Sequence, residues 1–148
     1  MPEQETLERA EQDKREGKSP STQAGEFVRE EIHHIREGKH GAASAKQAVA
    51  IGLSKARRAG VELPPPKKGR VSEKTRKAAE RDSSRGRSGK KKVSAKRSRS
   101  SEAALKREPR SAASHKALSR QAKSAARSRK KSGTATQSRR TQSRRKAA

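Results

Sequence analysis

The sequence predicts a mostly disordered chain that contains one small all-α unit, a helical hairpin. Composition predicts the disorder: 26% of the 148 residues are hydrophobic, 39% are charged, and the net charge is +25. A chain with so little apolar side chain cannot offset its conformational entropy by burial. A pattern predicts the hairpin, because apolar residues recur at helical spacing between residues 21 and 69.

Charge divides the chain into three regions. Residues 1–20 carry net charge −2 and alternate polar residues, so we expect a charged, disordered N-terminal segment. Residues 21–69 carry net charge +4 and hold the hairpin. Residues 70–148 carry 28 bases and five acids in Lys/Arg/Ser/Ala-rich sequence, which predicts a disordered, low-complexity basic tail.

The first helix of the hairpin is expected at about residues 25–37. Val28, Ile32 and Ile35 stand at i, i+4 and i+7, the spacing that aligns side chains on one helix face. Gly38 follows the last apolar residue, where glycine commonly ends a helix.

The second helix is expected at about residues 45–59. Ser44 and Gln47 have the spacing of a capping box, and Gly60 is placed to end the helix. Three prolines at 64–66 prevent its continuation. Phe27 and the apolar face of the first helix are expected to pack against Val49 and Leu53. So small a core without disulfides favours self-association or a protein partner for residues 21–69.

Within this region the run REGKHGAASAKQAVAIGLSKARRAGVELPPPKKG resembles a family of short, basic bacterial and phage proteins of unknown function. The family pattern is an EGK turn followed by QAxAIGLSxARxAG, and the resemblance covers about residues 26–69. Its most specific part consists of Gln47, Ala48, Ala50, Ile51, Gly52, Leu53, Ser54, Ala56, Arg57 and Gly60. The resemblance implies a bacterial setting and a small helical basic module, and it brings no catalytic residues.

The basic tail predicts sequence-independent binding to nucleic acid, because lysine and arginine release the counterions condensed on phosphates. Phe27 is the only aromatic residue of the chain, so the tail cannot stack bases, and DNA is favoured over RNA. The predicted phosphate contacts are Lys67, Lys68, Arg70, Lys90, Lys91, Lys92, Lys96, Arg97, Arg99, Arg127, Arg129, Lys130, Lys131, Arg139, Arg140, Arg144, Arg145 and Lys146. The expected role is architectural and nucleoid-associated, in the cytoplasm of a bacterium.

Parts of the tail are good helix formers, at residues 71–82, 100–108 and 111–131. Their like charges oppose folding in solution, so we expect transient helices that form when phosphate neutralises them. The tail resembles the C-terminal tails of linker histones in composition only.

Two other functions remain open from the sequence. The hairpin could be a protein–protein adaptor with the tail as an appendage, or the chain could associate with RNA or the ribosome. An enzyme is not expected, since no pocket can be built around a candidate acid, base or nucleophile. We likewise expect no cofactor, no small-molecule substrate and, for want of a long apolar stretch, no membrane contact.

Two more specific interpretations of the hairpin are weaker. Glu30, His33, His34 and Glu37 could share a metal ion, but a solvated helix face with Glu–His contacts is favoured, so no metal ligand is predicted. A helix-turn-helix interpretation would aim Lys46, Lys55, Arg57 and Arg58 at DNA. Its connecting loop is longer than that motif uses.

Overall fold

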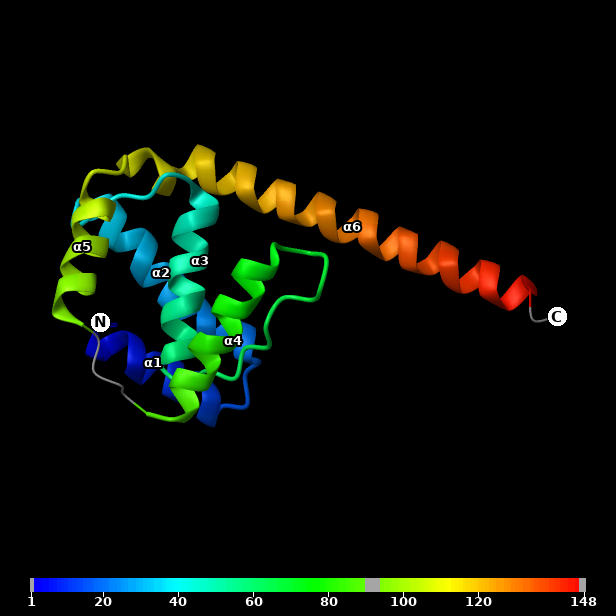
Figure 1. The fold of residues 1–148 in the computed structure, drawn as a ribbon, viewed down its shortest axis with the longest axis horizontal. Helices are drawn as coiled ribbons and strands as arrows, with labels where there is room; N and C mark the ends of the chain where they lie inside the picture. The colour runs from blue at the N-terminus through cyan, green and yellow to red at the C-terminus, as the bar shows by residue number, and fades with distance from the viewer. Residues whose placement is uncertain (1, 90–93, 147–148) are drawn as a thin grey trace.

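The computed structural model describes the backbone of residues 2–89 and 94–146, and the side chains of residues 2–89 and 94–131. The described residues form an all-α protein (Figure 1). Its α-helices are α1 (Gln4–Arg15), α2 (Pro20–Glu37), α3 (Ala45–Arg58), α4 (Glu73–Arg87), α5 (Ala95–Lys106) and α6 (His115–Lys146), with a short 3-10 helix, η1 (Arg110–Ala113), before α6. Helices α1 to α4 and η1 pack into one body, which α6 leaves as it runs to the C-terminal end.

The predicted fold class, mostly disordered with a small hairpin, is wrong. Helix α1 lies in the segment predicted to be disordered at residues 1–20, and α4, α5, η1 and α6 lie in the predicted disordered tail. The reason is the kind of residue that fills the core. Nine of the eleven buried hydrophobic residues among those described are alanine. Alanine has the best helix propensity and lets helices approach closely, so a few large side chains complete the core.

Helix α2 begins earlier than the predicted start at residue 25, because Ser19 and Pro20 form its N-terminus. The Ser19 side chain accepts a backbone hydrogen bond from the first turn. Pro20 occupies the first position of the helix, where a backbone N–H has no partner within the helix, so proline loses no hydrogen bond there. The helix ends at Gly38, whose φ of +81° is a left-handed conformation that favours glycine.

Helix α3 has the capping arrangement typical of its sequence. The Ser44 hydroxyl accepts from the Gln47 N–H at 3.2 Å, and the Gln47 side chain accepts from the Ala43 N–H at 2.9 Å. Gly60, with φ of +98°, follows the end of the helix. The Val61 N–H then bonds back to Ala56 O at 3.1 Å, which completes a Schellman motif.

A first hydrophobic cluster, the Phe27 cluster, joins α1, α2 and α3. Phe27 is 1% exposed and packs with Ala10, Ala24 and Ala56. Leu7, Leu53, Val61 and Leu63 cover its edges. Helices α2 and α3 approach closely at Gly52, where an added Cβ would lie 2.6 Å from the Cα of Val28.

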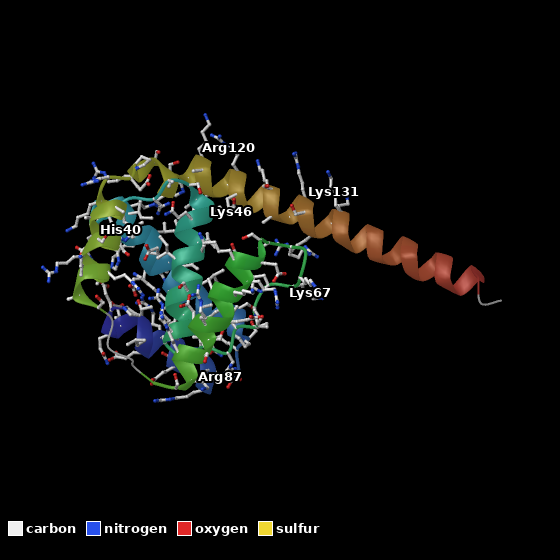
Figure 2. All side chains as sticks on the ribbon, in the orientation of Figure 1. His40, Lys46, Lys67, Arg87, Arg120 and Lys131 are labelled. Atoms are coloured by element: carbon white, nitrogen blue, oxygen red, sulfur yellow. The ribbon has the colours of Figure 1, made fainter. Side chains whose placement is uncertain are left out.

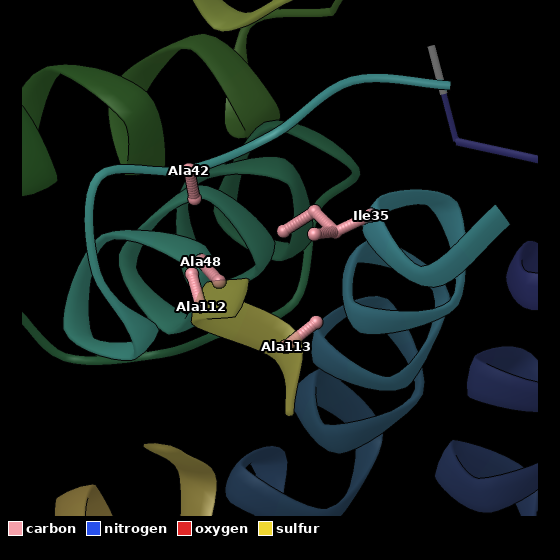
Figure 3. Packing of buried hydrophobic residues seen from close by; sticks show 5 residues of the cluster. All are labelled: Ile35, Ala42, Ala48, Ala112 and Ala113. Atoms are coloured by element: carbon pink, nitrogen blue, oxygen red, sulfur yellow. The ribbon is translucent and has the colours of Figure 1, made fainter. Parts of the chain in front are cut away.

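A second hydrophobic cluster, the Ile35 cluster, lies at the other end of the α2–α3 pair (Figure 3). Ile35 and Ala48 come from the hairpin and Ala42 from its loop, while Ala112 and Ala113 come from η1. All five are at most 5% exposed. Part of the predicted tail is therefore a structural component of the body.

Backbone hydrogen bonds fasten the same stretch of tail to the hairpin loop. Gly41 N–H donates to Leu105 O at 2.9 Å, and Ala42 N–H donates to Pro109 O at 3.1 Å. The approach requires glycine at position 41, since a Cβ there would lie 1.9 Å from Glu108 O. The segment from residue 105 to residue 113 thus closes over the α2–α3 loop.

Helix α1 is held to α2 by ion pairs as well as by the Phe27 cluster. Arg9 Nε lies 2.7 Å from Glu26 Oε2. At the start of the helix, Glu3 Oε1 lies 2.8 Å from His34 Nε2 and 3.0 Å from Lys39 Nζ. The hydrogen bond with His34, and after it the one with Lys39, lowers the pKa of Glu3 to about 2. The carboxylate of Glu3 therefore stays ionised across the physiological range.

Helix α4 packs on α3 through small and polar residues. Ala79 is buried, and an added Cβ at Gly86 would lie 2.1 Å from Arg57 O. The Ser54 hydroxyl donates to Asp82 Oδ2 at 2.5 Å, which ties the middle of α3 to α4. Helix α5 has no buried residue and joins the body through its C-terminal end. Among the described residues, no helix has the length and apolarity needed to cross a membrane.

Candidate nucleic-acid interface

The predicted phosphate contacts for which the structure describes side chains lie on three exposed elements. Lys67, Lys68 and Arg70 stand on the loop between α3 and α4, where Gly69 has φ of +81° and the Arg70 N–H donates to Lys67 O at 3.1 Å. This bond closes a tight turn, so the three cations are displayed by ordered backbone. Lys67 is labelled in Figure 2, together with Arg120 and Lys131 of α6.

Helix α5 displays the second set. Lys96, Arg97 and Arg99 are all exposed in its first turns. The one acid of the helix, Glu102, pairs with Lys106 at 2.8 Å, and the hydrogen bond from Lys106 lowers the pKa of Glu102. The negative charge of α5 is therefore neutralised within the helix and leaves its N-terminal cations to solvent.

Helix α6 displays the third set and is the most basic element of the protein. Its 32 residues contain twelve lysines and arginines and no acid. The predicted contacts Arg127, Arg129, Lys130 and Lys131 are exposed on it. Ser114 caps the start of α6, since its hydroxyl accepts from the Ala117 N–H at 3.2 Å. The tail sequence is thus presented as a helix rather than as a flexible polymer.

One face of α6 carries a row of cations that the sequence interpretation missed. Lys116, Arg120, Lys123 and Arg127 are spaced by four, three and four residues, which places them on one helix face. All four are exposed. We call this row the α6 stripe. The half-buried residues Leu118, Gln121 and Ala125 lie on a different face, so the α6 stripe is presented to solvent. Its signal in the sequence was the i, i+4, i+7, i+11 spacing of the bases.

The remaining predicted contacts fall outside the described side chains. Lys90, Lys91 and Lys92 lie in the segment between residues 89 and 94, outside the described residues. The backbone positions of Arg139, Arg140, Arg144, Arg145 and Lys146 belong to α6, but their side chains are outside the described set.

The cations of α3 that a helix-turn-helix would aim at DNA are mostly used inside the body. Lys55 is half-buried and lies 2.7 Å from Glu31 Oε2. Arg57 is buried, which lowers its pKa, and donates to Pro64 O at 3.3 Å. Arg58 lies 3.7 Å from Asp82 Oδ1. Among these four residues, Lys46 at the helix start and Arg58 at its end are exposed. Helix α3 is therefore a core helix and is not placed as a groove reader.

The four residues of the weaker metal interpretation lie on one face of α2, but that face is not solvated throughout, as the sequence suggested it would be. His33 and Glu37 are exposed and pair at 2.9 Å between His33 Nε2 and Glu37 Oε1. Glu30 and His34 are buried instead. The spacing was consistent with one face because residues three and four apart are neighbours, but α1 and α3 cover part of that face.

Comparison with known proteins finds a family to which the central part of the chain is similar. Residues 13–68 match the sequence model of a family described as "Family of unknown function (DUF6496)". No curated protein and no solved structure gave a match. The matched stretch runs from the end of α1 through α2 and α3 to the loop that follows. Over its α2–α3 unit, the chain is therefore similar to an uncharacterised protein family.

Proposed function

We propose that this protein binds nucleic acid without sequence specificity, and duplex DNA in preference to RNA, by neutralising phosphates with α6. The observation that carries the proposal is the α6 stripe on a helix of twelve bases and no acid. A helix of this kind fits along or within the DNA major groove, which is about as wide as an α-helix. We also propose a cytoplasmic, nucleoid-associated architectural role in a bacterium, the setting that the family resemblance implies.

The dimensions of the α6 stripe suit a phosphate backbone. Eleven residues separate Lys116 from Arg127, which corresponds to about 16 Å along the helix axis. Duplex DNA carries one negative charge per about 1.7 Å of its axis, so about nine phosphate charges lie along that length. The four cations can all find partners in more than one register. Such a surplus of equivalent partners favours binding without sequence preference.

The burial of Phe27 favours duplex over single-stranded nucleic acid as the ligand. Phe27 is 1% exposed and belongs to the core of the body. Proteins that hold single strands generally stack bases on exposed aromatic rings. The one Phe, Tyr or Trp ring of the protein is therefore not available for stacking, so contacts with phosphates carry the binding.

A quadruple substitution tests the proposal. Replacing Lys116, Arg120, Lys123 and Arg127 with glutamine removes four positive charges without adding negative ones. The slope of log K against log salt is expected to become shallower by about 3.6, since each duplex contact contributes about 0.9. Fluorescence anisotropy with a duplex of arbitrary sequence at several salt concentrations measures the slope.

Helix α4 supplies a matched control. Lys74, Lys77, Arg81 and Arg85 also comprise two lysines and two arginines over eleven residues, and all four are exposed. Their replacement with glutamine changes the net charge by the same amount. We expect this control to change the salt slope much less than the α6 variant, because α4 carries acids and packs on the body. Equal effects of the two variants would show that total charge, not α6, determines binding.

Competition experiments separate DNA from RNA. Unlabelled duplex DNA, duplex RNA and single-stranded DNA of equal length are added to the anisotropy sample. Duplex DNA is expected to compete best, and stronger competition by RNA would support the RNA or ribosome alternative. The adaptor alternative gains no specific support, because the apolar residues of the hairpin pack against α1 and η1 of the same chain.

A further inference from the structure

Three side chains that bear metal-ligating atoms meet inside the body. They are Glu31 and His34 of α2 and His40 of the α2–α3 loop, which we call the Glu31 cluster. One ligand atom of each lies within 4.8 Å of the others. Glu31 is 0% exposed, His34 is 8% exposed, and the His40 side chain is 14% exposed. The turn at Gly38 brings His40 (labelled in Figure 2) back toward α2.

The carboxylate of Glu31 lacks the partners that a fully buried charge needs. Its Oε2 lies 2.7 Å from Lys55 Nζ and its Oε1 lies 3.2 Å from His40 Nε2, but neither oxygen accepts a well-directed hydrogen bond. The same lysine also faces the buried carboxylate of Glu30 at 3.4 Å. Two buried carboxylates thus share one ammonium group. The negative charge of the two carboxylates exceeds the positive charge of Lys55, so a further cation would balance the site.

Hydrogen bonds to the far sides of the two imidazoles determine which ring nitrogens face the cluster. His34 Nε2 lies 2.8 Å from Glu3 Oε1, and an ionised carboxylate only accepts, so Nε2 carries the proton. His40 Nδ1 lies 3.1 Å from Gly41 O, and a carbonyl also only accepts. The nitrogens left with lone pairs are His34 Nδ1 and His40 Nε2. These two face the carboxylates of Glu30 and Glu31.

A lone pair that faces a carboxylate oxygen places two acceptors in contact. His40 Nε2 and Glu31 Oε1, at 3.2 Å, are such a pair. A positive charge between the two atoms relieves the repulsion, either as a second proton on the ring or as a metal ion. We propose that the Glu31 cluster is a binding site for a divalent transition-metal ion, Zn²⁺ being the best match to two imidazoles and one carboxylate.

The separations suit such an ion. Zinc lies about 2.0–2.2 Å from nitrogen and carboxylate oxygen, so two ligands of a tetrahedral site are about 3.3 Å apart. The pair His40 Nε2 and Glu31 Oε1 already has that separation. Small side-chain rotations bring in His34 Nδ1, while Lys55 retains the second oxygen of Glu31. A water molecule or the carboxylate of Glu30 would occupy the fourth coordination position.

The surroundings are those that metal-ligating histidines require. Such residues donate their second ring N–H to a carboxylate or a backbone carbonyl, which orients the ring and strengthens the ligand. Glu3 does this for His34, and the Gly41 carbonyl does it for His40. Glu3 comes from the start of the chain, just before α1. Metal binding therefore stabilises the contact of α1 and of the hairpin loop with α2.

Spectroscopy of the full-length protein tests the site directly. The protein, without a histidine tag and stripped of metal, is titrated with Co²⁺ and then with Zn²⁺ in the absence of nucleic acid. We expect one Co²⁺ per chain, with the intense visible absorption of a four-coordinate site, and its displacement by Zn²⁺. Zinc at 100-fold above its Kd is expected to raise the Tm by about 5–10 °C. This result does not depend on whether α6 binds DNA.

Substitutions then assign the ligands. His40→Asn is expected to weaken zinc binding by about 100-fold or more. Glu3→Gln, which alters the support of His34 and the pairing with Lys39 but removes no ligand, is expected to weaken it by about 10-fold. The matched control is His33→Asn, since His33 lies on α2 next to His34 but is exposed and paired with Glu37. Circular dichroism shows whether each variant retains its helices.

The outcomes of these experiments distinguish a bound metal ion from a second proton on the His40 ring. Absence of a stoichiometric Co²⁺ spectrum in the wild-type protein overturns the proposal, and so does a loss of zinc affinity in His33→Asn equal to that in His40→Asn. Should His40→Asn fail to fold, the wild-type spectrum and the Glu3→Gln variant still decide the matter. Nuclear magnetic resonance that finds His40 doubly protonated at neutral pH, with zinc present, also contradicts metal binding.

Discussion

Single glycines decide how closely the helices of this protein pack. An added Cβ at Gly52 would lie 2.6 Å from the Cα of Val28, so α2 and α3 touch through backbone atoms. Gly25, on α2, has no atom within 4 Å of the same position. Both glycines are inside helices, where alanine has the better intrinsic propensity. The two positions therefore differ in packing and not in secondary structure.

We predict that alanine has opposite effects at these two glycines. Gly52→Ala is expected to lower the free energy of unfolding by about 1–3 kcal/mol, because overpacking outweighs the gain in propensity. Gly25→Ala is expected to raise it by about 0.5–1 kcal/mol. Urea denaturation followed by circular dichroism measures both. A stabilised Gly52→Ala variant would show that α2 and α3 do not meet as closely as described.

Residues also show why local reasoning located some features and missed others. Ser44, Gln47, Gly38 and Gly60 were identified correctly because caps and turns depend on neighbours within about four residues. The Glu31 cluster was missed because its partners come from elsewhere. Glu31 stands in no motif of the sequence, and Lys55 and His40, which lie beside it, come from α3 and from the loop.

At the scale of elements, the loop between α2 and α3 is an attachment point for the C-terminal half. Gly41 and Ala42 donate backbone hydrogen bonds to residues 105 and 109, and Ala42 packs with η1. Arg36 Nε adds a hydrogen bond to Ala113 O at 3.0 Å. The amino-acid sequence of η1, RSAA, has no hydrophobic pattern that would predict its attachment to the α2–α3 loop.

We predict that Gly41→Ala releases this segment. The new Cβ would lie 1.9 Å from Glu108 O, so the chain at residues 105–113 must move away. Hydrogen exchange at the amides of Gly41 and Ala42 in the wild type provides the baseline, and the Ala42 amide is expected to exchange faster in the variant. Ala43→Ser, at an exposed position of the same loop, is the control. Unchanged exchange in Gly41→Ala would contradict the described docking.

At the scale of the whole molecule, the basic half of the chain has two separate tasks. Ala112 and Ala113 of η1 complete the Ile35 cluster, whereas most of α6 stands away from the body (Figure 1). Residues beyond position 70 therefore contribute both to the body and to the helix that leaves it. The part that leaves the body begins within α6.

Two truncations separate these tasks. A chain ending at residue 122 keeps η1 and the first turns of α6 but loses ten basic residues, so it should retain its Tm within about 3 °C and bind DNA much more weakly. A chain ending at residue 89 loses η1 and should melt at least about 5 °C lower, because the Ile35 cluster becomes exposed. Differential scanning calorimetry and anisotropy measure the two properties. Equal Tm values for both truncations would argue against a structural role for η1.

By itself the sequence determined the features that depend on near neighbours and on composition. These are the helix ends at Gly38 and Gly60, the cap at Ser44, the asymmetric distribution of charge and the absence of exposed aromatic rings along the tail. Only the tertiary structure showed that most of the chain is folded. Its core is made of alanines that count for little in a composition, and they become a core only when distant segments bring them together. Ala113 is far in sequence from Ala42 and Ala48, yet all three are 0% exposed in one cluster, and no local pattern predicts that they meet.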